Sequence, residues 1–315
     1  MQPLKNGRDF SEENDVGHAT GHAAGRFAEA DRFARPGVSS TGANFKPLQK
    51  LIEEKTGIFL PERKKMLFTS RLNSRLKSLR LKSIDAYTQY LRHAPDAENE
   101  LARAVDCLTT HTTHFYREKH HFEFLNDVVF PHLLQEGEKT GVRRLAVWCA
   151  GCSTGEEVYT VAITTNTFWG QYPSWKIKIM ATDISREILE VARTGIYPHS
   201  IKKNIPTLYL RSFFTEVTSD GLRCLQVKPI LENMISFEEH NLMDGSPSPF
   251  PFDIIFCRNV LIYMGKEAKK DILNTFYRAL RDDGFLFLGH SESLIGLNDK
   301  FYPMGRTIYQ KIPEA

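Results

Sequence analysis

The stretch LAVWCAGCSTGEEVYTVAI, residues 145–163, followed by IKIMATD, residues 177–183, decides the fold. Its first five residues are apolar, which predicts a short buried strand. Small residues at 150–155 predict a turn, a helix is predicted from Glu156, and a second apolar run ends at Asp183. The order of strand, glycine loop, helix, strand and acid predicts one unit of a doubly wound, Rossmann-like α/β sheet.

The polar residues of this unit indicate the kind of ligand it binds. In a doubly wound sheet, the strand ends and the helix start lie at one edge, where ligands bind. Gly151 and Gly155 have no Cβ, so the backbone can approach a ligand closely, although both could be ordinary turn glycines. Glu156 and Glu157 suit an ammonium group better than a phosphate, and Asp183 is placed to accept hydrogen bonds from a ribose diol. The combination favours S-adenosylmethionine over NAD.

Composition restricts the class of protein. The 315 residues are 41% hydrophobic and 25% charged, which is ordinary for a soluble globular protein. No apolar run approaches the roughly 18 residues of a membrane span, and the N-terminus lacks the apolar segment of a secretory signal. Five cysteines, an odd number, suit a reduced compartment, so we expect a cytoplasmic protein. Cys149 and Cys152 could indicate redox or zinc chemistry, but no second pair exists, and we predict a structural role and no metal.

Patterning divides the chain into parts with different expectations. Residues 1–44 are rich in Gly, Ala, His and Ser without apolar periodicity, which predicts a disordered extension. Residues 45–110 predict a small helical domain, and 111–134 a linker followed by a helix. Residues 135–315 predict the α/β domain, with an antiparallel hairpin insertion at about 200–232.

The helical part is strongly basic. Between residues 46 and 85, 11 Lys and Arg face 4 Asp and Glu, a net charge of +7. A solvated helix face does not need such a bias, so the charge predicts an acidic partner. Aromatic residues do not alternate with the basic ones as base stacking would require, which disfavours nucleic acid.

Two further segments carry candidate ligand contacts. Residues 109–118 are rich in Thr and His and end in Arg117-Glu118. Thr113 could cap the following helix, or the segment could face a ligand; spacing alone leaves both open. The apolar run 252–257 predicts another parallel strand, and Arg258-Asn259 just beyond it would reach the ligand-binding edge.

From residue 45 to residue 311 the chain resembles the CheR family of chemotaxis-receptor glutamate methyltransferases. The stretches that carry the resemblance are Arg117–Phe122, Cys152–Glu157, Ala181–Ile184, Phe252–Val260 and Gly289–Ser293. The resemblance implies an all-helical N-terminal domain, a Rossmann-like S-adenosylmethionine methyltransferase domain and a small antiparallel β-subdomain inserted in it. The predicted hairpin matches that subdomain.

The resemblance also implies roles for individual residues. The implied cofactor-binding residues are His111, Thr113, Arg117, Gly151, Glu156, Glu157, Asp183, Asn241, Leu242, Arg258 and Asn259. The basic helix that would dock on the receptor carries Arg71, Arg75 and Arg80. The sequence departs from the family pattern at His111, where Asn is common, at Tyr116, a usual Phe, and at Val158, where Pro is common.

The expected reaction esterifies glutamate side chains on the cytoplasmic helices of chemoreceptors. A free Glu has a pKa of about 4.3, so its carboxylate is already ionised at neutral pH and needs no general base. Alignment of the reacting atoms then becomes the main contribution, roughly 7–11 kcal/mol at best. Arg117 or Tyr263 could orient the carboxylate, and Arg117 is favoured because a guanidinium matches its two oxygens.

Alternatives from two other classes would use the same residues. A module that senses S-adenosylmethionine or its product without turnover would share the cofactor pocket. A nucleic-acid methyltransferase is disfavoured because Arg258-Asn-Val-Leu replaces the Asn/Asp-Pro-Pro-aromatic loop of base-amino methylases. We expect a monomer that does not insert into membranes, and capture of a receptor C-terminal peptide by the β-subdomain stays open.

Overall fold

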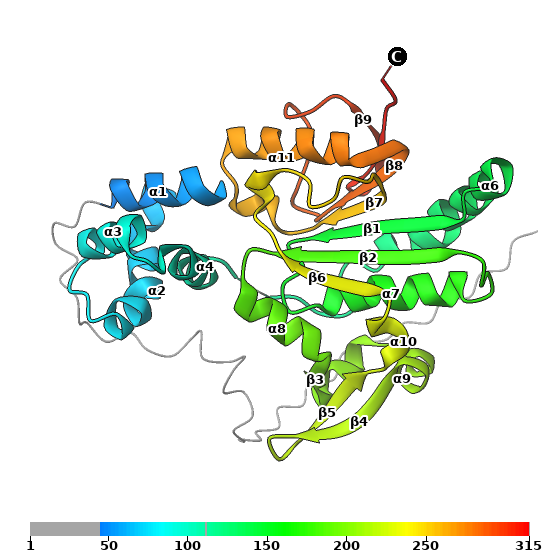
Figure 1. The fold of residues 1–315 in the computed structure, drawn as a ribbon, viewed down its shortest axis with the longest axis horizontal. Helices are drawn as coiled ribbons and strands as arrows, with labels where there is room; N and C mark the ends of the chain where they lie inside the picture. Colours follow the sequence, from blue (N-terminus) through cyan, green and yellow to red (C-terminus); the bar gives the residue numbers. More distant parts are fainter. Residues whose placement is uncertain (1–44, 111, 315) are drawn as a thin grey trace, which may run out of the picture. The chain divides into compact units, whose positions relative to one another are not determined.

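The computed structural model describes residues 45–110 and 112–314 (Figure 1). The predicted extension over residues 1–44 and the predicted contact of His111 therefore lie outside the described residues. None of the helices within those ranges combines the length and apolarity that a bilayer span requires.

The N-terminal part is all-helical, as predicted. Its elements are α1 (Lys46–Thr56), η2 (Glu62–Lys64), α2 (Lys65–Ser78), α3 (Ile84–His93) and α4 (Ala97–Leu108). Leu48 and Ile52 of α1 and Leu72 and Leu76 of α2 are spaced four residues apart, so each pair lies on one helix face, and all four are fully buried together with Tyr87. This small core orients the basic helix α2 with its other faces toward solvent.

A seven-stranded sheet forms the second part. Its strands, in spatial order, are β6 (Ile235–Glu239), β2 (Lys176–Asp183), β1 (Arg144–Ala150), β7 (Phe252–Cys257), β8 (Leu280–Leu288), β10 (Ile308–Lys311) and β9 (Phe301–Gly305). The pairs among the first five are parallel, and β10 pairs antiparallel with both β8 and β9. β2 and β6 are added on one side of β1, and the chain then crosses to the other side, where it adds β7 and β8. The strand order therefore reverses between β1 and β7. The predicted doubly wound sheet is confirmed, with a topological switch point there.

Alternate residues of β1 belong to two separate cores. Val147 and Cys149 pack with α5 (His120–Phe124), η3 (Leu125–Val129), α6 (Phe130–Thr140), α7 (Glu156–Trp169) and α8 (Arg186–Thr194). Trp148 and Ala150 pack with η5 (Leu242–Asp244), η6 (Leu261–Tyr263) and α11 (Lys266–Ala279) on the opposite face. Because both faces are covered, β1 is apolar along nearly its whole length, which is why the sequence shows a run and not an alternation.

A three-stranded antiparallel sheet is inserted after α8. It is formed by β3 (Ile196–Pro198), β5 (Leu222–Val227) and β4 (Phe214–Ser219), in that order, with the helices η4 (His199–Asn204), α9 (Thr207–Phe213) and α10 (Pro229–Glu232) alongside. Asp220 and Gly221 both have positive φ, 50° and 76°, as a tight two-residue hairpin requires. The predicted hairpin is confirmed, and β3 is an additional strand that the sequence did not indicate.

Main-chain hydrogen bonds join the helical part to the sheet domain. Phe59 N donates to Tyr263 O at 2.9 Å, Gly265 N donates to Gly57 O at 2.9 Å, and Ile58 forms an antiparallel bridge with Met264. These contacts hold the end of α1 against the segment that follows β7, at the carboxyl edge of the sheet (Figure 1).

Candidate active site

A cavity of about 220 Å³ lies at the carboxyl ends of β1, β2 and β7. The predicted site residues that line it are Thr113, Arg117, Gly151, Glu157, Asp183, Asn241, Leu242, Arg258, Asn259 and Tyr263. The helical part closes it with Thr56, Ile58 and Val105. Residues that lie more than 200 positions apart in the chain therefore meet at the switch point, as the edge rule for doubly wound sheets predicts.

The glycine loop is shaped by its backbone and fixed by one carboxylate. Gly151 has φ +73°, and a Cβ there would lie 2.5 Å from Val260 Cγ2, so only glycine fits. Asp183 accepts hydrogen bonds from Ser153 N at 2.9 Å and Ser185 N at 3.1 Å. Asp183 therefore both lines the cavity and holds the loop between β1 and α7 in position.

Arg258 is buried between two carboxylates. Its side chain has no solvent exposure; Nη1 donates to Glu157 Oε2 at 2.8 Å, and Nη2 lies 3.3 Å from Glu118 Oε2. Nη2 also donates to the carbonyl oxygen of Arg117 at 2.5 Å, and the guanidinium lies 5.6 Å from the centre of the Phe122 ring. Burial raises the pKa of Glu157, and the charge of Arg258 opposes that rise. Arg258 thus ties the helix α7, the linker and β7 together beneath the cavity.

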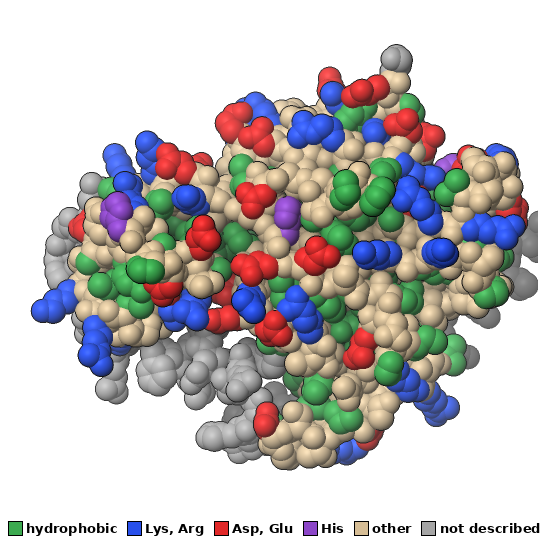
Figure 2. Space-filling view, in the orientation of Figure 1, with side chains coloured by type: hydrophobic (Ala, Val, Ile, Leu, Met, Phe, Trp, Pro, Cys, Tyr) green, Lys and Arg blue, Asp and Glu red, His purple; other side chains and the backbone are tan. Residues whose placement is uncertain are grey.

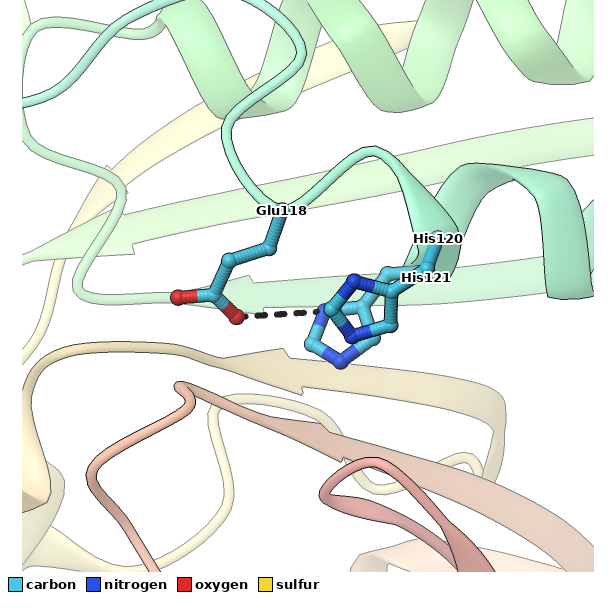
Figure 3. Close-up of side chains that lie close together, drawn as sticks. All are labelled: Glu118, His120 and His121. Atoms are coloured by element: carbon cyan, nitrogen blue, oxygen red, sulfur yellow. Dashed lines mark ion pairs between the residues drawn. The ribbon is translucent and has the colours of Figure 1, made fainter. Parts of the chain in front are cut away.

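Glu118 lies beside two histidines (Figure 3). Glu118, His120 and His121 bring three potential metal-ligating atoms within 4.8 Å of one another, the one such group among the residues that the structure describes. His121 Nδ1 faces Glu118 Oε2 at 3.6 Å, but the Arg258 guanidinium already lies 3.3 Å from the same oxygen. Burial and the nearby Arg258 lower the pKa of His121 to about 4. We interpret the cluster as the surroundings of a carboxylate–arginine pair and not as a metal centre.

The linker presents Arg117 to the cavity. Arg117 Nη1 donates to Thr112 O at 2.8 Å, and Tyr263 Oη donates to Thr110 O at 3.3 Å across the same cavity wall. The helix that follows begins at His120, and Lys119 at its N-cap makes no capping side-chain hydrogen bond. The capping alternative for Thr113 is therefore wrong, and the ligand-facing alternative fits its position in the cavity wall.

The comparisons with known proteins agree over both parts of the chain. The family described as "CheR methyltransferase, SAM binding domain" matches residues 111–310, and "CheR methyltransferase, all-alpha domain" matches residues 43–109. The chain belongs to the CheR methyltransferase family. The predicted cofactor, S-adenosylmethionine, is the one for which that domain is named, and the predicted family is confirmed.

Two curated relatives are similar to this CheR-family chain over most of their length. A chemotaxis protein methyltransferase of Borreliella burgdorferi is 36% identical over 87% of this chain and 96% of its own. One from Escherichia coli is 37% identical over 86% of this chain and 92% of its own. Among solved structures, magnesium protoporphyrin IX methyltransferase from Synechocystis is 17% identical, covers 53% of this chain and 57% of its own, and has a TM-score of 0.28, too low to support an argument.

The cavity of this CheR-family protein fits the cofactor chemically. Glu157 and Asp183 place two carboxylates in its wall, which suit an ammonium group and a ribose diol. Leu242 and Val260 supply apolar surface, and the missing Cβ of Gly151 leaves room against Val260. Glu156 does not line the cavity; its carboxylate accepts a hydrogen bond from Thr154 Oγ1 at 2.6 Å, so Glu157 is the acid that the helix presents.

The predicted docking arginines of the CheR-family basic helix differ in their surroundings. Arg75 forms a two-point ion pair with Glu100, whose side chain is fully buried and also accepts from Tyr87 Oη at 2.7 Å. The resemblance implies that Arg75 docks on the receptor, whereas in the structure its guanidinium is paired with the buried Glu100 and its side chain is only 21% exposed. Arg71 donates to Leu108 O at 2.8 Å, and Arg80 is exposed at a positive φ of 57°.

Substituting Gly151 by alanine should lower the affinity of this CheR-family protein for S-adenosylmethionine at least tenfold. The left-handed backbone costs alanine about 1–2 kcal/mol, and the clash with Val260 adds a similar amount by moving the loop. Calorimetric titration would measure the effect. Gly141→Ala is the matched control, because Gly141 has φ +75° with nothing within 4 Å of its added Cβ. Equal affinities for the two variants would contradict the close approach at Gly151.

Proposed function

We propose that this chain is a protein-glutamate O-methyltransferase that acts on the cytoplasmic helices of chemoreceptors. The observation that carries the proposal is a second cavity, of about 380 Å³, that shares part of its wall with the first. The residues common to both walls are Ile58, Thr110, Ile262, Tyr263 and Met264. A side chain that reaches inward from this second cavity, the docking groove, would meet the cofactor cavity beside Tyr263.

The docking groove suits an acidic amphipathic helix. Arg63, Lys64 and Lys269 give its wall a positive charge, and Phe59 and Leu67 are about half-exposed apolar side chains in the same wall. Lys and Arg side chains also stand out around the helical part in Figure 2. Apolar anchors flanked by charge are the usual means of binding an amphipathic helix, and the sign here selects an acidic one.

The chemistry needs alignment and not proton transfer. When bound, S-adenosylmethionine would supply a methyl group that moves to a carboxylate oxygen, with release of a neutral thioether. The glutamate carboxylate is ionised at neutral pH, so no side chain has to remove a proton. Arg117 is in the cavity wall and can pair with both carboxylate oxygens, while Tyr263 lies where the two cavities meet.

The deciding experiment is transfer of label from [methyl-³H]S-adenosylmethionine to chemoreceptor-containing membranes. We expect protein-bound label that mild base releases as methanol, because an ester is hydrolysed while an N-methyl group is not. Label that resists base would contradict ester formation. Cofactor binding without any transfer would favour the sensing module, for which the comparisons give no support.

The β-subdomain offers a second contact for the receptor. Within the described residues, β4 lies at the edge of its three-stranded sheet and pairs only with β5. An extended receptor C-terminal peptide could add a strand there through main-chain hydrogen bonds. We propose that the enzyme acts in the cytoplasm as a monomer, where it can reach both the receptor helix and such a tail.

Reversing charge in the docking groove should lower receptor methylation about tenfold or more. Arg63→Glu with Lys64→Glu replaces attraction for an acidic helix by repulsion, while neither residue lines the cofactor cavity. Initial rates at limiting receptor concentration would measure the loss, with calorimetry showing unchanged cofactor affinity. Lys176→Glu with Lys178→Glu, two exposed lysines on β2 that line neither cavity, is the charge-matched control. Methylation at the wild-type rate in the double variant would contradict the groove.

A further inference from the structure

Arg117 lies between two residues in a strained backbone conformation. Tyr116 has φ 58° and Glu118 has φ 56°, and neither is glycine. The left-handed region costs such residues about 1–2 kcal/mol each, so the conformation persists only where surrounding contacts enforce it. Arg117, which lies between these two strained residues, faces the cofactor cavity.

A small set of contacts holds the backbone of this turn. Tyr116 N donates to Thr160 Oγ1 of α7 at 3.2 Å, Arg117 N donates to His114 O at 3.3 Å, and His121 N donates to Glu118 O at 3.0 Å. The shortest contact is the one from Arg258 Nη2 to the carbonyl oxygen of Arg117, at 2.5 Å. Arg258 is therefore the one side chain among these contacts that holds the Arg117 carbonyl, and the position of its guanidinium affects that of the Arg117 backbone.

Glu118 is one of the two carboxylates that hold Arg258. Its Oε1 accepts from His290 Nδ1 at 2.8 Å, and its Oε2 lies 3.3 Å from Arg258 Nη2. Burial alone would raise the pKa of Glu118, but the hydrogen bond from His290 and the charge of Arg258 hold it at about 2. Glu118 is therefore ionised at neutral pH, yet it is absent from the wall of the cofactor cavity.

We propose that Glu118 is a positioning residue for methyl transfer, acting through Arg258 to fix the backbone of Arg117. Glu118 follows Arg117 in the turn, and its side chain pairs with Arg258. Arg258 in turn donates to the carbonyl oxygen of Arg117, so Glu118 holds the group that holds the Arg117 backbone. The second carboxylate, Glu157, anchors the other side of the Arg258 guanidinium at 2.8 Å. The inference rests on the proposed function, because its consequence is the alignment of the substrate carboxylate by Arg117.

A double-mutant cycle tests this role directly. Glu118→Gln keeps the shape of the side chain and removes its charge, and we expect kcat for receptor methylation to fall at least tenfold. In an Arg117→Ala background the same substitution should change kcat less than twofold, because the group that it positions is gone. An equal loss in both backgrounds would show that Glu118 contributes only to general stability, and would overturn the proposal.

Two matched variants separate positioning from other effects. Glu123→Gln neutralises an exposed glutamate of the same segment, paired with Lys119, and should leave kcat unchanged. Arg258→Lys retains the positive charge but cannot reach Glu118, Glu157 and the Arg117 carbonyl together. It should reproduce the kcat loss and the non-additivity with Arg117→Ala, which keeps the test open should Glu118→Gln not fold.

A readout that needs no turnover separates this inference from the proposed function. Amide hydrogen exchange over residues 114–118 should be faster in Glu118→Gln than in the wild type, while exchange in β1 stays the same. Wild-type protein that methylates no receptor would refute the proposed function, and the exchange comparison would still test the turn. Unchanged exchange at 114–118 in a folded variant would refute the positioning role alone.

Discussion

Replacing Asp183 by asparagine is expected to weaken S-adenosylmethionine binding about 100-fold or more. The carboxylate accepts from Ser153 N and Ser185 N, and an amide group can accept at only one of its two ends. One backbone N–H would then face another donor, which costs about 1–3 kcal/mol, and the charge-assisted contact to a ribose hydroxyl would be lost as well. A total of about 3 kcal/mol corresponds to roughly two orders of magnitude in affinity. Isothermal titration calorimetry measures it.

Asp253 provides the control for Asp183. It is also a buried carboxylate on a strand, with a pKa raised by burial, and it accepts from Ala146 N at 2.7 Å. It lies near the start of β7, at the opposite end of the sheet, and does not line the cavity. Asp253→Asn should lower the melting temperature and leave the cofactor affinity within about twofold. Similar affinity losses in the two variants would show that the effect of Asp183 is one of general stability.

Replacing Arg258 by methionine is expected to destabilise the folded state by about 3–5 kcal/mol. The substitution leaves Glu157 and Glu118 without their shared counter-ion in a buried site, and an uncompensated buried charge is among the costliest defects in a protein core. Urea unfolding followed by circular dichroism gives the free energy of unfolding. Adding Glu118→Gln and Glu157→Gln to the same chain should recover much of the loss, and failure of that rescue would contradict the electrostatic explanation.

The cost of losing Arg258 should depend on pH. In the wild type the pKa of Glu118 is about 2, below its ordinary 4.5, so its contribution to stability is present above pH 4.5 and is lost as pH falls toward 2. Without Arg258, burial raises the pKa of Glu157 against only the weaker opposing charge of Arg117. A carboxyl group with a raised pKa stabilises the folded state at pH values below its pKa in the unfolded chain. That stabilisation is lost as pH rises through its pKa in the folded protein. The gap between variant and wild type should therefore be smaller at pH 5 than at pH 7, and a constant gap would contradict this account.

The core unit of the fold could be predicted because its signals are local. An apolar run, a glycine loop and a helix start follow one another within residues 145–163, and the structure places β1 and α7 there. Because the carboxyl ends of parallel strands meet at one edge of the sheet, Asp183 and Arg258 were predicted to lie close together, and both line the same cavity. Two strands were missed for physical reasons: β3 has only three residues, and β9 contains Pro303, which cannot donate to a ladder and suits an edge strand.

The partners of individual side chains could not be predicted, because they depend on three-dimensional packing. Glu156 and Glu157 are adjacent acids in the sequence, but they point in different directions from the first turn of α7: Glu157 lines the cavity, and Glu156 accepts from Thr154 Oγ1. Arg75 belongs to the basic pattern of residues 46–85, but its guanidinium pairs with Glu100, 25 residues later in the chain. Thr56 and Val105 reach the cavity from the helical part, and no motif marks them.

The seam between the two parts of the chain has a consequence for evolvability. It includes two main-chain hydrogen bonds, Phe59 N to Tyr263 O and Gly265 N to Gly57 O, and side-chain contacts such as Asn241 Nδ2 to Lys55 O at 2.7 Å and Arg103 Nε to Glu187 Oε1 at 2.8 Å. None of these contacts comes from α2, so mutations on its outer surface leave this junction intact. The helical part can therefore diversify toward new receptors while the geometry for methyl transfer is inherited unchanged.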